Sequence, residues 1–284
     1  MSSLKERFFI GSIRRLLNGT ARMSRKQAGK LGYYLLSKPR RFPENPGQER
    51  FVDEAEQWQI EDSNGTELHC YHWAGPGPTV LLMHGWESYT GRWFAFYRPL
   101  VEAGYSLYAF DAPAHGRSGG RRFNALLYQQ SLTSFLNHLG FAPQYWVCHS
   151  AGGMAAMLYL TDQPRFEPHR LVSLAVPGEL TDFIDRFCEV VGIHDKVKEG
   201  IDMQFRRKLE VSLKDVSFIE FARRLRVPGL IIHDSCDEIA PLSGAAAMHA
   251  NWRGSRFITT EDCGHSLLGD EVPALVTEYL DSQR

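Results

Sequence analysis

The chain has 284 residues, of which 43% are hydrophobic and 23% are charged, and its net charge is −1. This length suits one large α/β domain with an insertion or two modest domains, and the balanced charge argues against nucleic acid as a partner. No run approaches the roughly 18 apolar residues of a membrane span, and no apolar leader with a small-residue cleavage site opens the chain. Five cysteines without framework spacing fit reduced thiols. We therefore expect a soluble, cytoplasmic protein.

The first 41 residues are strongly basic, with eleven lysines and arginines against a single acidic residue, Glu6. Apolar residues recur at helical spacing up to Leu17, and Asn18-Gly19 is a typical helix end. Ser24 and Gln27 then have the spacing of a capping box for a second helix. We expect a basic helical arm and linker over residues 1–48, which docks on its own domain or a second subunit, or contacts an anionic membrane surface.

From residue 49 onward the pattern predicts an α/β domain. Strands over 56–61 and 67–73 flank Asn64-Gly65, a strong two-residue hairpin signal. The run Thr79–Met83 has the continuous apolar character of a strand that is buried on both faces. Further strands near 105–110, 144–147, 171–175, 230–233 and 256–259 alternate with helical segments. Such alternation predicts a mostly parallel sheet of about eight strands with helices on both faces.

The alternation stops between about residues 178 and 225, where only helical patches are found. An all-helical insertion at this point is typical of a cap over the site, although a structural excursion on the surface would give the same pattern. Three aromatic residues of this cap, Phe183, Phe187 and Phe205, are our candidates for contacts with an apolar or acyl-chain substrate.

The segment around Ser150 predicts a nucleophile. An apolar strand ends in Cys148-His149, and a helical pattern begins after Ser150-Ala151-Gly152. A sharp strand-to-helix turn presents a serine hydroxyl, and it requires small residues on both sides because strand and helix pack closely there. The usual first glycine is here Cys148, which we expect to be tolerated as a small residue.

Two loops after later strands supply partners for this serine. Asp237 follows the strand over 230–233, and His265 follows the last strand. Parallel strands end at one edge of the sheet, so these side chains should converge on Ser150 as base and orienting carboxylate. Asp234 and Glu238 compete with Asp237 for the acid, and we expect them to be local backbone acceptors or solvated charges.

An oxyanion hole is expected where the first buried strand ends. Gly85 permits a close approach, so the backbone N–H groups of Trp86 and Ala151 can point at one spot. His84 is expected to brace this loop by hydrogen bonds rather than to titrate in catalysis.

With these motifs the sequence resembles the α/β-hydrolase family over roughly residues 55–284. The resemblance rests on His84-Gly85-Trp86, Asp111–Ser118, His149–Gly153, the Asp237 loop and Gly264-His265, in the order Ser…Asp…His. It implies the α/β-hydrolase fold, with a hydrolase domain at 49–284 and a cap at about 178–225. It also implies that the Asp111–Ser118 loop is structural.

The resemblance further implies an esterase-like serine hydrolase that forms an acyl-enzyme on Ser150, with His265 as base, Asp237 as orienting acid, and neither metal nor organic cofactor. Its partner would be a small-molecule acyl substrate. An acyltransferase with the same triad and a non-catalytic ligand receptor are the alternatives. Three cysteines flank the expected triad, namely Cys148, Cys236 and Cys263. We expect them to be small residues that fill tight loops, and a redox pair between Cys236 and Cys263 is the alternative.

Overall fold

The computed structural model describes residues 4–43 and 45–282, and an eight-stranded sheet lies at its centre. In space the strands follow the order β1-β2-β4-β3-β5-β6-β7-β8. Their bounds are β1 (Glu56–Glu61), β2 (Glu67–Trp73), β3 (Thr79–Met83), β4 (Ser106–Phe110), β5 (Tyr145–His149), β6 (Arg170–Leu174), β7 (Gly229–Asp234) and β8 (Ser255–Thr260). The pairs β1–β2 and β2–β4 are antiparallel, and all other neighbouring strands are parallel.

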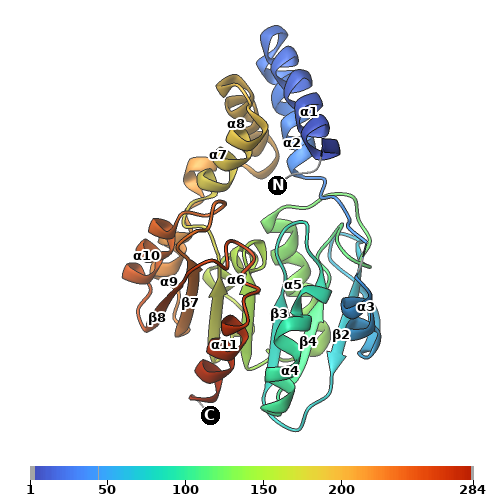
Figure 1. Ribbon diagram of the computed structural model, residues 1–284, viewed down its shortest axis with the longest axis vertical. Helices are drawn as coiled ribbons and strands as arrows, with labels where there is room; N and C mark the ends of the chain where they lie inside the picture. Colours follow the sequence, from blue (N-terminus) through green and yellow to red (C-terminus); the bar gives the residue numbers. More distant parts are fainter. Residues whose placement is uncertain (1–3, 44, 283–284) are drawn as a thin grey trace. The chain divides into compact units, whose positions relative to one another are not determined.

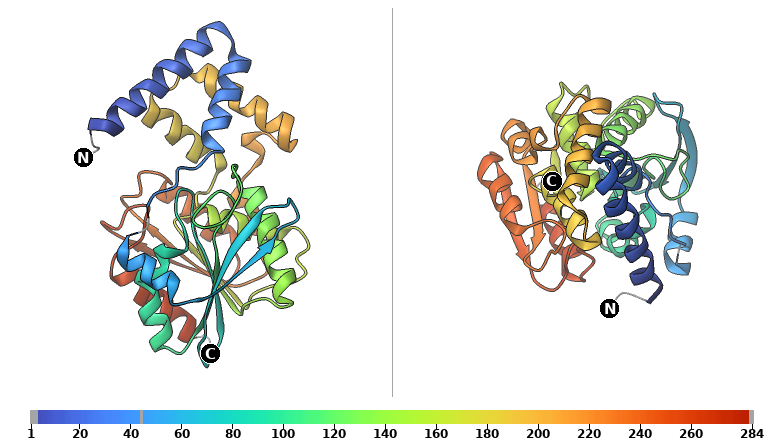
Figure 2. Two further views of the ribbon diagram at one scale, coloured as in Figure 1. Left: turned by 90° about the vertical axis from the view of Figure 1, so that its right-hand side faces the viewer. Right: turned by 90° about the horizontal axis from the view of Figure 1, so that it is seen from above.

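Helices cover both faces of this sheet (Figure 1 and Figure 2). On one face α3 (Pro46–Asp53), the short helix η1 (Thr90–Trp93), α4 (Phe94–Glu102) and α11 (Glu271–Asp281) pack together. The other layer is formed by α5 (Ala125–Leu139), α6 (Ala151–Thr161), α9 (Phe218–Arg224) and α10 (Leu242–Asn251). Strands β5 and β7 are buried at every residue because both of their faces are covered. The predicted α/β class and the mostly parallel sheet are confirmed.

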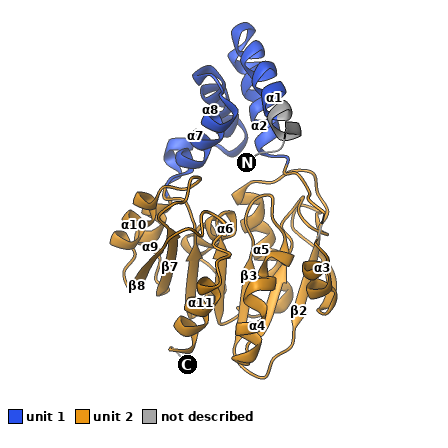
Figure 3. Ribbon diagram, viewed as in Figure 1, with its two compact units in different colours: residues 1–38, 179–217 blue, residues 39–178, 218–284 orange. Residues whose placement is uncertain are grey.

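The chain divides into two compact units, which Figure 3 shows in different colours. We call residues 39–178 and 218–284 the sheet unit, and the described residues of 1–38 together with 179–217 the helical unit. The helical unit contains α1 (Leu4–Met23), α2 (Arg25–Leu36), α7 (Leu180–Val191), α8 (Asp195–Leu209) and the short helix η2 (Leu213–Asp215). The basic arm and the insertion, more than 140 residues apart in the sequence, thus share one core.

Side chains from both segments fill the core of the helical unit. Leu17 and Ala28 from the arm pack with Ile184 and Ile201 from the insertion, and all four are buried. Helices α2 and α8 approach through glycines, because a Cβ built on Gly29 would lie 2.1 Å from the carbonyl carbon of Gly200. Only residues without a side chain permit this crossing. The first side chains of the predicted apolar stripe, Leu4, Phe8 and Phe9, lie outside the described ones.

Several boundaries differ from the sequence analysis. Helix α1 does not end at Asn18-Gly19 but continues to Met23. The side chain of Asn18 does not cap its own helix. Its amide donates to the carbonyl oxygen of Gly192 at 2.9 Å, and its oxygen accepts from the N–H of His194 at 2.8 Å. This tertiary contact holds the turn between α7 and α8.

The segment expected as linker also contains a helix, α3, which the sequence analysis missed. Asn45 accepts hydrogen bonds from the N–H groups of Gly47 and Gln48, and Pro46 occupies the first turn. An N-cap asparagine followed by proline is a helix-start signal. At the other end of the insertion, helical structure continues to Arg224 as predicted, but α9 belongs to the sheet unit, so the helical unit itself ends at residue 217.

Within the described residues, no helix is both long enough and apolar enough to cross a membrane.

Candidate active site

Ser150 lies in the sharp turn between β5 and α6, with φ 48° and ψ −115°. A positive φ is strained for a residue with a Cβ, at a cost of about 1–3 kcal/mol. The backbone of the sheet unit fixes this conformation. The N–H of Ser150 donates to the carbonyl oxygen of Leu174 in β6 at 2.8 Å, and the carbonyl of Ser150 accepts from Met154 at 3.0 Å.

Close packing around the turn explains its small residues. A Cβ on Gly152 would lie 2.5 Å from the carbonyl oxygen of Met83, and one on Gly153 would lie 2.2 Å from Cγ2 of Val176. Cys148 is fully buried, and burial raises the pKa of its thiol. At neutral pH this thiol is therefore protonated and acts as a small apolar side chain.

The ends of β5, β7 and β8 bring Ser150, Asp237 and His265 together. Nε2 of His265 lies 3.0 Å from Oγ of Ser150, and Nδ1 of His265 lies 2.8 Å from Oδ2 of Asp237. The carboxylate accepts from the Nδ1–H, which leaves the Nε2 lone pair facing the serine hydroxyl. This is the hydrogen-bond chain of a base that is positioned against a nucleophile.

Asp237 is held as an ionised, immobile acceptor. Its side chain is fully buried, and Oδ1 accepts from the N–H groups of Ile239 at 2.8 Å and Ala240 at 2.9 Å. Oδ2 also lies 3.3 Å from Nε2 of His233. Burial alone would raise the pKa of Asp237, but hydrogen bonds from His233, His265 and Ala240 hold this pKa far below its usual range.

Asp234 is a buried structural acceptor, and its hydrogen bonds come from two backbone N–H groups and a hydroxyl rather than from the imidazole of His265. It accepts from the N–H of Cys236 at 2.9 Å, the hydroxyl of Thr260 at 2.8 Å and the N–H of Cys263 at 2.9 Å. These donors lower the pKa of Asp234 although burial opposes ionisation. The carboxylate thereby ties the loop that carries Asp237 to the loop that carries His265. Glu238 is exposed.

The predicted oxyanion donors lie on segments that border Ser150. A Cβ on Gly85 would lie 2.7 Å from Nδ1 of His149 and 3.2 Å from Cβ of Ser150, so the loop after β3 passes directly beside the turn. Trp86 follows in this loop. The N–H of Ala151 is the first of α6 and has no intrahelical acceptor.

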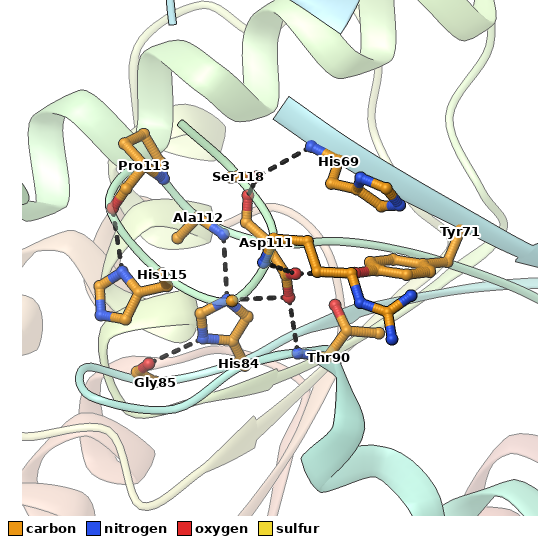
Figure 4. Close-up of polar contacts among 12 residues, drawn as sticks. His69, Tyr71, His84, Gly85, Thr90, Asp111, Ala112, Pro113, His115 and Ser118 are labelled. Carbon is orange, nitrogen blue, oxygen red and sulfur yellow. Dashed lines mark hydrogen bonds and ion pairs between the residues drawn. The ribbon is translucent and has the colours of Figure 1, made fainter. Parts of the chain in front are cut away.

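A buried polar network around Asp111 positions this loop (Figure 4). The carboxylate of Asp111 accepts from the hydroxyl of Tyr71 and from the N–H groups of Thr90 and Arg117, each at 2.8 Å. Burial would raise the pKa of Asp111, but the hydrogen bonds from these three donors lower it. The network joins β2, the loop after β3 and the loop after β4, as expected for a structural Asp111–Ser118 segment.

His84 has the bracing role expected from the sequence. Its Nε2 accepts from the N–H of Ala112 at 3.0 Å, so Nδ1 carries the proton and donates to the carbonyl of Gly85 at 2.8 Å. Full burial lowers its pKa. A neutral imidazole therefore links the two loops.

Two residues beside the triad were missed by the sequence analysis. His149 donates from Nε2 to the backbone oxygen of His265 at 2.8 Å, and Arg92 donates from Nη2 to that of Ser266 at 2.6 Å. Both therefore fix the loop that carries the base. The sequence contained a signal for each residue. His149 directly precedes the serine, and Arg92 is a charged residue in the otherwise apolar and small-residue stretch Thr90–Phe94.

A cavity of about 410 Å³ within the sheet unit reaches this site. His149 and His265 line it from the triad side, and Arg40, Arg41 and Arg92 line it elsewhere. Among the described residues, no cluster of three or more His, Cys, Asp or Glu side chains has the arrangement of a metal site.

Known proteins resemble this chain in sequence and in fold. A family model described as serine aminopeptidase, S33 matches residues 74–182. An esterase from Pyrococcus furiosus superposes with a TM-score of 0.67 at 18% identity, over 87% of this chain and 97% of the esterase. Over residues 74–182 the chain matches this family, and as a whole it has the α/β-hydrolase fold.

Sequence relatives of the chain include enzymes whose names give different activities. It is 25% identical over 275 residues to monoacylglycerol lipase abhd6-B of Xenopus laevis, covering 78% of this chain and 81% of the lipase. It is 28% identical over 165 residues to a dihydrolipoyllysine-residue acetyltransferase component of the acetoin cleaving system from Cupriavidus necator. That match covers 56% of this chain but only 40% of the relative's length. The comparisons support a hydrolase.

The predicted substrate contacts of this chain lie in the helical unit, whereas the triad lies in the sheet unit. Phe183 and Phe205 pack against the core of the helical unit, and Phe205 also meets the ring of Tyr33 edge-on at 5.5 Å. Phe187 is half-buried. Their role in substrate binding stays a prediction.

Proposed function

We propose that this chain is a serine hydrolase that cleaves a carboxylic ester or a related acyl bond through an acyl-enzyme. One observation carries the proposal. The imidazole of His265 lies between the hydroxyl of Ser150 at 3.0 Å and the buried carboxylate of Asp237 at 2.8 Å. The lipases and esterases among its relatives and structural neighbours support the same chemistry.

In the proposed reaction, Oγ of Ser150 attacks the acyl carbonyl while Nε2 of His265 accepts the hydroxyl proton. Asp237 keeps the other ring nitrogen protonated and stabilises the imidazolium. The N–H groups of Trp86 and Ala151 hold the oxyanion of the tetrahedral intermediate. His265 then protonates the departing alcohol. In the second half, His265 takes a proton from water as the water oxygen attacks the acyl group. His265 then returns this proton to Oγ of Ser150 as the carboxylic acid departs, which restores the free enzyme.

A serine-reactive fluorophosphonate probe and a series of p-nitrophenyl esters test this proposal. The wild-type protein should be labelled and should release p-nitrophenolate, whereas Ser150→Ala should lose both properties with an unchanged unfolding midpoint. The same assay separates the alternatives. An acyltransferase would accumulate a transfer product when an alcohol or thiol acceptor is added, and a receptor would show neither labelling nor turnover. Near-full turnover by pure Ser150→Ala would refute the nucleophile assignment.

A further inference from the structure

Arg92 is a buried arginine for which the described residues offer no carboxylate partner. Its relative exposure is 6%, and it lies on η1, directly after the loop that follows β3. Nη2 donates to the carbonyl oxygen of Ser266, and the guanidinium lies 4.8 Å from the ring of Trp93. Nη1 is buried without a hydrogen-bond partner. Among the residues that the structure describes, no Asp or Glu lies within ion-pair distance of Arg92.

A buried charge without a counterion is costly, and such groups are rare unless they are paired. Burial lowers the pKa of Arg92 to about 9, so the guanidinium still carries its proton at neutral pH. The side chain therefore keeps a fixed positive charge and an unused donor in a place from which solvent is largely excluded.

This charge borders the cavity that reaches the triad, and the remainder of the cavity wall does not neutralise it. Among the described residues of the wall, Glu87 is the single carboxylate, and it already pairs with Arg40 at 2.6 Å. Arg41 directs its donors to the backbone oxygens of Ala114, Gly116 and Ser118, which carry no net charge. In the described part of the wall, three guanidinium groups thus lie around about 410 Å³ of space together with one carboxylate.

We propose that this cavity binds an oxyanion group of the substrate, a carboxylate or a phosphate, and that Arg92 is the residue that recognises it. The guanidinium fork matches either group through charge-assisted hydrogen bonds. His265 lines the same cavity, so the anion would lie within one small molecule's length of the scissile bond. This inference rests on the proposed function and adds to it a substrate class: esters that carry a negative charge.

Paired esters test the proposal in two arms. In the first arm the carboxylate is on the acyl side, and kcat/KM is compared for mono-p-nitrophenyl glutarate and neutral p-nitrophenyl pentanoate. In the second arm the carboxylate is on the alcohol side, and 4-(butanoyloxy)benzoate is compared with its methyl ester. In the arm whose carboxylate reaches Arg92, the ratio of kcat/KM for the anionic ester to kcat/KM for the neutral ester should fall about tenfold or more in Arg92→Gln. A charge-assisted hydrogen bond exceeds a neutral one by about the free energy that corresponds to this factor. Arg92→Lys should retain part of the ratio.

The ratio separates recognition from positioning. If Arg92 acted only by holding Ser266, its loss would slow both members of a pair equally and leave the ratio unchanged. Arg98→Gln is the matched control, because Arg98 is exposed and pairs with Glu102 on α4, away from the cavity wall. It should leave rates and ratios as in the wild type.

Binding without turnover gives a second measurement, on the wild-type protein itself. Glutarate or inorganic phosphate should raise its melting temperature and inhibit hydrolysis of the neutral ester, whereas glutaramide should do neither. Whichever of glutarate and phosphate has the larger effect shows whether the site prefers a carboxylate or a phosphate. Unchanged ratios in both arms, or equal effects of glutarate and glutaramide, would overturn the proposal. If the hydrolase assignment itself is wrong, no ester will be turned over and the fluorophosphonate probe will not label the protein. In that case the melting temperatures with glutarate, phosphate and glutaramide still test the anion site.

Discussion

Replacing Asp237 with asparagine should abolish most of the activity while leaving the site's geometry intact. Oδ1 of Asp237 accepts two backbone N–H groups, from Ile239 and Ala240, so the asparagine oxygen will occupy that position. Its amide nitrogen then replaces Oδ2 and faces Nδ1 of His265. Because an amide N–H donates, Nδ1 must become the acceptor, and the ring proton moves to Nε2. The base then cannot accept the proton of Ser150.

The expected loss is large because the wrong tautomer removes general-base catalysis and not only a favourable charge. A change of this kind costs about 10⁴-fold in kcat, which corresponds to about 5 kcal/mol of transition-state stabilisation. The assay is kcat for a short p-nitrophenyl ester, with the urea midpoint measured in parallel to separate chemistry from folding.

Asp234→Asn is the matched comparison, three residues away in the same loop. Asp234 accepts from Thr260 and from two backbone N–H groups, so asparagine should lose at least one of these bonds. We expect about 1–3 kcal/mol lower stability and a far smaller loss of kcat. Glu238→Gln should change neither. A mild effect in Asp237→Asn together with a loss of orders of magnitude in Asp234→Asn would show that the triad acid is misassigned.

Further predictions concern pH and the helical unit. Burial lowers the pKa of His84, His115 and His149, that of His115 to about 3. An unfolded histidine titrates near 6.5, so below that pH the unfolded chain binds protons that the folded chain excludes. The free energy of unfolding should fall by about 1.4 kcal/mol per pH unit for each histidine. Urea midpoints that stay constant from about pH 7 to pH 5 would contradict this. Gly200→Val should unfold the helical unit, because any Cβ there meets the backbone of α2. Gly19→Ala, at a position with open space around it, should instead stabilise α1 by about 1 kcal/mol. Circular dichroism melts compare the two variants, and similar melting temperatures would argue against the glycine crossing. Deleting residues 1–36 should remove Leu17 and Ala28 from the core of the helical unit and lower the melting temperature. If instead the chain with the arm binds anionic vesicles in a salt-sensitive way and the deletion variant does not, a membrane role for the arm would be favoured.

The sequence by itself determined the strands of the sheet unit, because their signals are local. Asn64-Gly65 specifies a hairpin, Thr79–Met83 has the composition of a doubly covered strand, and the small residues around Ser150 are those that a tight strand-to-helix turn requires. The order of Ser150, Asp237 and His265 after successive strands places them at one sheet edge, since parallel strands share the direction of their ends. These residues could therefore be identified from the sequence, because steric constraints and sheet topology determine where they lie.

Only the tertiary structure decided what depends on contacts between distant segments. Asn18-Gly19 has the local chemistry of a helix end, but its side chain is used by the turn at Gly192, and α1 continues. The arm and the insertion share a core through Gly29 and Gly200, and no local pattern indicates which glycine meets which. The unpaired charge of Arg92 was likewise invisible in the sequence, because a missing counterion is a property of the folded surroundings and not of the residue.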